Sequence, residues 1–116
     1  MNGTILDAPS GEAERAAAER AAAERAAEEA RAKQEADAHI SDLRARLDEI
    51  DAKMISLWQE RAAISREVGQ IRVAAGGTRL VLSREQEILD RFRNALGADG
   101  AQLALLVLRA GRGKLV

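Results

Sequence analysis

The 116-residue sequence is poor in residue types that build many active sites and cross-linked folds. It contains no cysteine and no tyrosine, and only one each of proline, phenylalanine, tryptophan and histidine. Without cysteine there is neither a disulfide framework nor thiol chemistry, and the lone His39 argues against a structural zinc site. The Ala-, Leu- and Arg-rich remainder is typical of an all-α protein.

Long apolar runs are also missing. No stretch approaches the length of a membrane span, and residues 1–10 lack the basic segment and apolar core of a signal peptide. The net charge is −1, and residues 41–116 carry a surplus of only three positive charges. That surplus is too small for a duplex nucleic-acid binder, and aromatic residues for stacking on bases are nearly absent. We expect a cytoplasmic protein with no nucleic-acid or membrane partner and a small anionic ligand.

The chain divides by composition into three segments. Residues 1–11 hold the only proline and two glycines, and we predict that they are disordered. Residues 12–39 repeat Ala-Glu-Arg-Ala-Ala, a five-residue period that moves the charges around a helix and leaves no apolar stripe. This pattern favours a solvated helical spacer over a binding arm. Residues 40–116 form the predicted functional domain.

A seam of apolar residues spaced three and four apart predicts one long helix. The seam runs from Ile40 to Ile71, and Gly76 and Gly77 are expected to end the helix near Ala74. Such a helix is on the order of 50 Å long. That length exceeds any core that this chain can bury alone.

Two short helices are predicted after a loop. Ser83 is a good N-cap, and Gln86 completes a capping box for a helix to about Ala95. A short apolar helix follows at 103–108, and residues 111–113 are expected to release a C-terminal tail. One long and two short helices do not close a core in a monomer. We therefore predict an all-α, intertwined helical homodimer in which the long helices pair and the short ones cover them.

Arg61 occupies a position of the seam where an apolar residue is expected. A guanidinium in a dry seam is costly unless an anion pairs with it, so either an internal carboxylate or an anionic ligand must meet Arg61. At 100° per residue, Ser65 and Arg72 share its face, and Gly69 leaves space there. Arg44 lies about 25 Å away along the axis. It could reach the same ligand only from a second, antiparallel chain.

Arg79, Arg84 and Glu85 follow in the loop and at the start of the second helix. A helix N-terminus favours anions, and arginine suits a bidentate grip on a planar carboxylate. The set fits a ligand with two or more carboxylates and a hydroxyl group for Glu85. Taken singly, Arg84 and Glu85 also fit ordinary surface positions, and Arg72 also fits a helix C-terminus.

Several short motifs occur in a fixed order within residues 40–116: Leu43-Arg44, Leu47, Asp51, Glu60-Arg61, Val68-Gly69, Arg72 and Ser83-Arg84-Glu85. Together they resemble the AroQ-type chorismate mutases. Residues 76–81 and 109–113 are similar to the short delta subclass of actinobacteria. The resemblance does not extend to the Ala-Glu-Arg repeat.

The resemblance implies a Claisen rearrangement of chorismate to prephenate, a step of the shikimate pathway toward phenylalanine and tyrosine. This reaction is pericyclic, so the resemblance implies no cofactor, metal, nucleophile or proton shuttle. Arg44 would bind one substrate carboxylate across the dimer, and Arg61 would bind the other from its own chain. Arg72 would contact the ether oxygen, where negative charge develops.

The remaining implied roles complete the pocket. Arg84 would line it, Glu85 would accept a hydrogen bond from the ring hydroxyl, Val81 would offer backbone contacts and Ser65 would form a wall. Longer bacterial members have an acidic residue at the Val81 position and a glutamine from a longer third helix, which this chain lacks. Delta-subclass enzymes are weak alone and are activated by DAHP synthase. The implied contact residues for that partner are Arg112, Gly113, Lys114 and Leu115.

Two other interpretations remain open at this point. An isochorismate pyruvate-lyase shares the fold and the arginine set and differs in its substrate. A non-catalytic helical interaction module would use the Ala-Glu-Arg segment for binding. In that second case Arg61 should pair with a carboxylate of its own chain.

Overall fold

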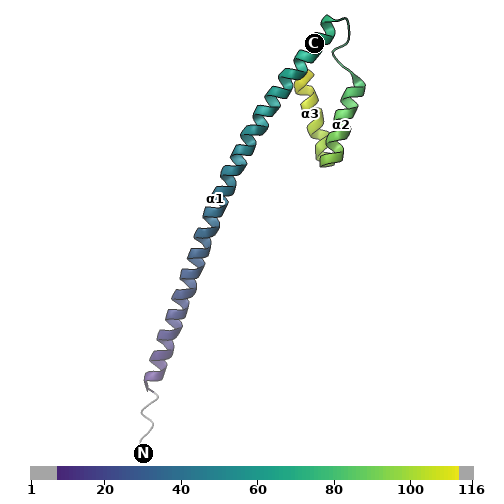
Figure 1. Cartoon of the computed structure of the whole chain (residues 1–116). Helices are drawn as coiled ribbons and strands as arrows, with labels where there is room; N and C mark the ends of the chain where they lie inside the picture. Colours follow the sequence, from purple (N-terminus) through teal and green to yellow (C-terminus); the bar gives the residue numbers. More distant parts are fainter. Residues whose placement is uncertain (1–7, 113–116) are drawn as a thin grey trace, which may run out of the picture. The chain divides into compact units, whose positions relative to one another are not determined.

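The computed structural model describes residues 8–112, with side chains described from residue 11 onward. Within that range the chain forms no strand and three α-helices: α1 (Ala8–Ala74), α2 (Leu82–Leu96) and α3 (Ala98–Arg112) (Figure 1). The prediction of an all-α chain with one long and two short helices is confirmed. None of the described helices is both long enough and apolar enough to cross a membrane.

The chain divides into two units, and the first, which ends at Asp48, holds the amino-terminal part of α1. The helix begins at Ala8. Pro9 therefore falls in the first turn, where its missing N–H costs no helical hydrogen bond. We had expected the helix to begin only after residue 11; residues 1–7 lie outside the described residues. No side chain from 11 to 48 is buried, so helix formation here depends on local preferences.

Two glycines close the carboxyl end of α1, as predicted. Gly76 has a positive φ of 86°. Its N–H donates to the Val73 carbonyl at 3.1 Å, and the Gly77 N–H donates to the Arg72 carbonyl at 2.8 Å. This pair of hydrogen bonds is a Schellman motif, which favours glycine at the left-handed position. The motif holds Arg72 in the last turn of α1.

The predicted capping box of α2 is wrong. The helix begins at Leu82, and its N-cap is Val81, which is extended (φ −120°, ψ 103°) and makes no side-chain cap hydrogen bond. The Val81 carbonyl accepts the Glu85 N–H at 3.1 Å and thereby starts the helix. The Gln86 side chain donates to Asp90 Oδ1 at 2.9 Å, so it extends along the helix instead of turning back to cap it.

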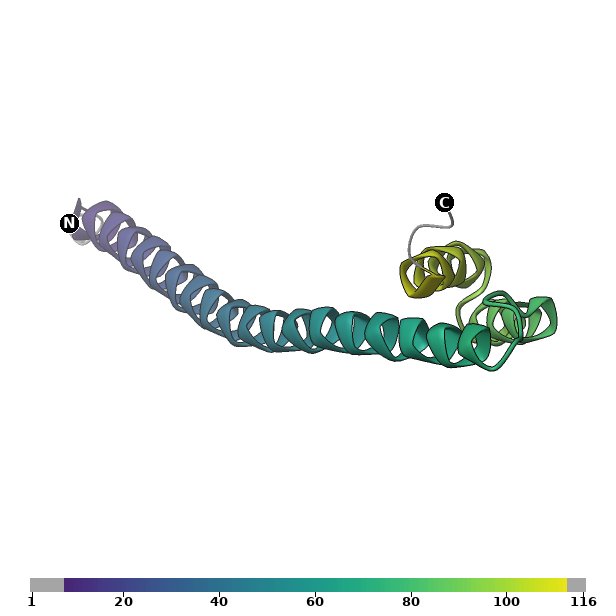
Figure 2. The ribbon, with the colours of Figure 1, turned by 90° about the horizontal axis from the view of Figure 1, so that it is seen from above.

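The second unit, which begins at Glu49, contains a hairpin of α2 and α3. Gly97, with φ 74°, makes the turn, and the two helices lie side by side (Figures 1 and 2). Gly100 is buried so close to the Phe92 carbonyl that a β-carbon would overlap it. The apolar core of the hairpin consists of Ile88, Ala104 and Leu108, with Leu89 and Phe92 packed against them.

α3 is longer than predicted, because it continues to Arg112 instead of releasing the chain near residue 111. Its last turn contacts α1. Arg66 Nη1 donates to the Ala110 carbonyl at 3.3 Å. Gly111 is buried against Ser65. These tertiary contacts keep a glycine-containing turn helical against its weak intrinsic preference.

The apolar seam of α1 is uncovered in the single chain. In the second unit, Met54 is 60% exposed, Leu57 62% and Ile71 61%. The seam residues of the first unit are exposed as well: Ile40, Leu43 and Leu47. An apolar stripe of this kind normally faces another surface. The homodimer nevertheless stays a prediction, since a single chain does not test it.

Candidate functional site

The second unit contains a cavity of about 430 Å³. Its walls come from the carboxyl part of α1, the loop before α2, α2 itself and α3. Small-molecule sites in proteins have volumes of about 300–1,000 Å³, so this cavity suits a small ligand. The lining residues are Arg61, Ile64, Ser65, Arg66, Val68, Gly69, Gln70, Arg72, Arg79, Val81, Arg84, Glu85, Ile88, Leu108, Gly111 and Arg112.

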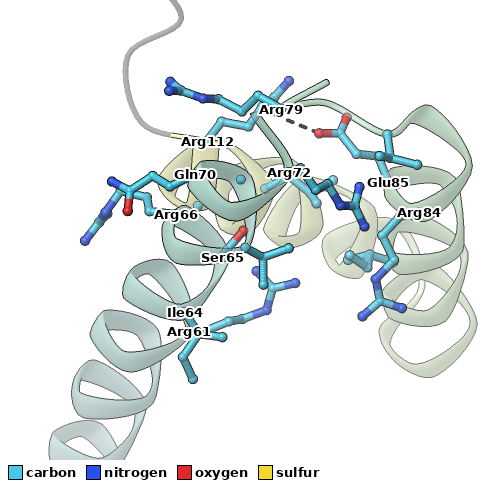
Figure 3. Close-up of a pocket in the computed structure, with 16 residues that line it drawn as sticks. Arg61, Ile64, Ser65, Arg66, Gln70, Arg72, Arg79, Arg84, Glu85 and Arg112 are labelled. Atoms are coloured by element: carbon cyan, nitrogen blue, oxygen red, sulfur yellow. Dashed lines mark ion pairs between the residues drawn. The ribbon is translucent and has the colours of Figure 1, made fainter. Parts of the chain in front are cut away.

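The α1 wall brings together the residues that helical spacing predicted. Arg61, Ser65 and Arg72 line the cavity, and Figure 3 shows both arginines extending from α1 toward α2. Gly69 is buried between them along the helix. A β-carbon there would lie 3.3 Å from Cγ of Arg79, so the glycine leaves room for the loop arginine to cross the helix.

The α2 wall supplies Arg84 and Glu85 from the first turn of the helix, with Val81 immediately before it. The positive end of the helix dipole therefore adds to the arginine charges. Arg84 Nη1 lies 3.3 Å from Glu87 Oε2, but the two side chains are 53% and 63% exposed. An exposed pair of this kind is weak, so Arg84 remains available to an anion in the cavity.

Positive charge dominates the cavity, because Glu85 is the only acid among its lining residues. The lining arginines are Arg61, Arg66, Arg72, Arg79, Arg84 and Arg112. Burial lowers the pKa of Arg61, and the nearby charges of Arg84 and Arg91 lower it further.

The surroundings of Arg61 distinguish between the two predicted partners for its charge, an internal carboxylate and an anionic ligand. Within residues 11–112, no carboxylate forms an ion pair with it. A half-buried guanidinium among like charges and without an anion is energetically unfavourable. The free chain thus favours an anionic ligand over the internal carboxylate that a non-catalytic helical module would require.

Arg112 contributes to the cavity from the end of α3. Its Nε lies 3.7 Å from Glu85 Oε1, the ion pair drawn as a dashed line in Figure 3. The resemblance had placed Arg112 in a partner contact, and sequence reasoning did not place it in the cavity. Arg66 and Gly111 were missed as well. No local pattern identifies these three residues, because they reach the cavity through the packing of α3 on α1.

Two groups of predicted residues do not line the cavity. Arg44 belongs to the first unit, where it borders a depression with Asp37, Ile40, Ser41, Ala45 and Asp48. Its expected place in the site therefore requires a second copy of the chain. Gly113, Lys114 and Leu115 lie outside the described residues. In residues 8–112, no three His, Cys, Asp or Glu side chains are grouped so that they could hold a metal ion.

Comparison with known proteins gives consistent matches over about two thirds of the chain. The sequence pattern of the family "Chorismate mutase type II" matches residues 43–107. The intracellular chorismate mutase of Mycolicibacterium smegmatis is 48% identical over 81 residues, covering 70% of this chain and 78% of that protein. The intracellular chorismate mutase of Mycobacterium tuberculosis is 47% identical over 76 residues, covering 66% and 71%.

A solved structure is similar in fold as well as in sequence. It is described as a non-covalent complex of DAHP synthase and chorismate mutase from Corynebacterium glutamicum with a bound transition state analog. The matched chain superimposes with a TM-score of 0.66 at 40% sequence identity, covering 70% of this chain and 98% of that one. The matches agree with the resemblance that the order of motifs indicated.

Proposed function

The chain belongs to the chorismate mutase type II family, and we propose that its arginine-lined cavity binds chorismate and rearranges it to prephenate. As a member of this family it is an isomerase. The observation that supports the site most directly is the group formed by Arg61, Arg72 and Arg84 around a cavity whose single acid is Glu85. Chorismate carries two carboxylates and a ring hydroxyl, which match this set.

The rearrangement breaks the ether C–O bond and forms a C–C bond within one molecule, with no proton transferred. The protein must therefore confine a compact conformer and stabilise the charge that develops on the ether oxygen. Arg61 binds one carboxylate, and Arg72, held in the last turn of α1, contacts the ether oxygen. Glu85 accepts a hydrogen bond from the ring hydroxyl, while Val81, Arg84 and Ser65 complete the walls.

The proposed active form is a homodimer. Its support is the exposed apolar seam of α1 and the position of Arg44 outside the cavity. In an antiparallel pair of long helices, Arg44 of one copy falls beside the segment that carries Arg61 and Arg72 in the other. The relatives are named intracellular, and a cytoplasmic location is part of this proposal.

Mixing variants tests the shared site. Arg44→Ala and Arg72→Ala are each expected to be inactive as homodimers. A heterodimer of the two variants carries both lesions in one site and neither in the other, so refolding the variants together should restore measurable turnover. No recovery, with dimers present by light scattering, would show that each chain builds its own site.

The mutase assay tests the activity itself. Purified protein is mixed with chorismate, and loss of its ultraviolet absorbance is followed together with acid conversion of the product to phenylpyruvate. Turnover should fall by about 100- to 1,000-fold in Arg61→Ala and Arg72→Ala. It should be unchanged in Arg93→Ala, an α2 arginine paired with Asp90 at 3.8 Å and absent from the cavity lining. Pyruvate release from isochorismate, without prephenate formation from chorismate, would instead assign a lyase.

We further propose that DAHP synthase is an activating partner. The support is the similarity to the Corynebacterium glutamicum chain, which is in complex with that enzyme. The proposed contact residues are Arg112, Gly113, Lys114 and Leu115. Adding the synthase should raise kcat/KM for the full chain and should have less effect after deletion of residues 113–116. An equal response in both proteins contradicts the proposed contact.

A further inference from the structure

The ion pair between Arg112 and Glu85 differs from the two ion pairs within α2. Its side chains are only 26% and 22% exposed, whereas the pairs within α2 are more than half exposed. Nε of Arg112 is buried and has no hydrogen-bond partner, since 3.7 Å to Glu85 Oε1 is too long for a hydrogen bond. The attraction in a shielded pair is screened less than at the surface, and removing one partner leaves the other charge without compensation.

The close approach of α3 to α1 delivers Arg112 to this place. Gly111 lies so near Ser65 that a β-carbon on the glycine would stand 2.5 Å from Ser65 Oγ and 2.7 Å from Ser65 Cβ. One residue earlier, the Ala110 carbonyl accepts a hydrogen bond from Arg66. The last turn of α3 is therefore seated on α1 by two successive residues, and the next residue reaches α2.

Glu85 requires such a partner because its surroundings compete for it. As the only acid lining the cavity, it faces several arginines that the substrate carboxylates need. If the Glu85 carboxylate turned to Arg72 or Arg84, it would neutralise a binding cation and lose its own place beside the ligand hydroxyl. Arg112 pairs with it from α3, a helix that carries none of the proposed substrate-binding arginines.

We propose that Arg112 is a positioning residue, seated by the contact of Gly111 with Ser65, that holds the Glu85 carboxylate in place and keeps it from the substrate-binding arginines. This inference rests on the proposed function, in which Glu85 contacts the substrate. It assigns Arg112 a role within the chain in addition to any partner contact. Arg112 acts through Glu85 and need not touch the substrate.

A double-mutant cycle in the full-length protein tests the coupling. Arg112→Ala should lower kcat/KM by about tenfold, which lies within the range of couplings between residues of one ion-pair network. In the Glu85→Gln background the same change should have little further effect, because the carboxylate that Arg112 positions is gone. Arg112→Lys should recover part of the loss. Arg109→Ala, an exposed arginine of α3 outside the cavity lining, is the matched control and should equal the wild type.

A size exchange tests the seating contact independently. Gly111→Ala should lower kcat/KM as Arg112→Ala does. In a Ser65→Gly background the same Gly111→Ala change should lower kcat/KM less, because Ser65→Gly removes both atoms that the new β-carbon would meet. Thermal unfolding of every variant separates this effect from loss of the fold.

The outcomes separate the two proposals. Equal losses from Arg112→Ala in the wild-type and Glu85→Gln backgrounds would overturn the positioning role while leaving the mutase activity intact. The same holds if Arg112→Ala has no effect on its own. A wild-type protein that does not convert chorismate, with or without DAHP synthase, would remove the proposed function and this inference with it.

Discussion

The two units of the chain are both helical, but different interactions stabilise their helices. In the first unit, up to Asp48, no described side chain is buried. In the second, α2 and α3 bury a small core around Ile88 and Ala104. The first unit therefore owes its helix to alanine content and charge spacing, whereas the second owes its arrangement to packing. Helical structure by itself does not distinguish a spacer from a site.

Arginine shows the same difference between the units. In the repeat, each of Arg15, Arg20 and Arg25 is followed four residues later by a glutamate, so every cation has a local anion within reach. In the second unit, Arg61 has no carboxylate partner among the described residues and has Arg84 and Arg91 nearby. The same side chain is a solvated surface group in the repeat and, in our proposal, an anion-binding group at Arg61. The charges of the neighbouring side chains determine which of these two roles an arginine can take.

The largest expected contrast is in catalysis. Arg72→Ala should raise the activation free energy for kcat/KM by about 2.7–4 kcal/mol, the usual cost of removing one preorganised donor. Arg31→Ala, an exposed arginine of the first unit, should leave it unchanged. Steady-state kinetics with chorismate measure both variants, and circular dichroism checks their helix content. Equal losses in the two variants would mean that the Ala-Glu-Arg repeat takes part in the reaction.

A glycine in each unit gives the next contrast. Gly100→Ala should destabilise the second unit by about 1–3 kcal/mol through overpacking, because the new β-carbon meets the Phe92 carbonyl. Gly11→Ala meets nothing within 4 Å and should raise helix stability by about 0.5–1 kcal/mol. Thermal unfolding and helicity by circular dichroism report the two effects. A neutral Gly100→Ala would mean that the hairpin yields at this contact.

Replacing Arg61 should separate stability from function. Arg61→Leu removes a half-buried cation from like-charged neighbours, and we expect it to raise the unfolding free energy of the ligand-free protein by about 1 kcal/mol. Chorismate turnover should be lost in the same variant. Arg93→Leu, in an exposed pair, serves as the control. Denaturant unfolding measures the unfolding free energy of both variants. A clear loss of stability in Arg61→Leu would indicate that a carboxylate of the protein pairs with Arg61.

The smallest effect is expected from shortening the first unit. A chain that starts at residue 34 keeps Arg44 and the whole apolar seam but loses most of the Ala-Glu-Arg repeat. Its kcat and KM should equal those of the full chain if the repeat is a solvated spacer. A large change in either constant would favour the alternative interpretation of the repeat as a binding arm.

The fold was predictable where it depends on neighbours in sequence. The apolar seam and Gly76-Gly77 correctly predicted the end of α1 at Ala74, because helix period and the left-handed glycine are local properties. The Ser83 cap was wrong, since the extended Val81 starts α2 earlier. The end of α3 was wrong because contacts with α1 stabilise its last turn.

The site was predictable to a similar extent. The face formed by Arg61, Ser65 and Arg72 follows from 3.6 residues per turn, and all three line the cavity. Arg84 and Glu85 line it as well, as the charge pattern of the loop and the second helix indicated. Arg112 reached the cavity without any local signal. Its contact with Glu85 joins residues of two helices, next to the point where Gly111 approaches Ser65 of a third.

The sequence by itself determined the helical class, the limit of α1 and the arginine face of that helix, since each follows from spacing along one continuous backbone. The tertiary structure decided that Arg61 meets like charges instead of an internal carboxylate, and that Gly111 seats Arg112 beside Glu85. These features depend on how closely separate helices approach, to within the size of one β-carbon. No periodicity along the chain encodes that distance.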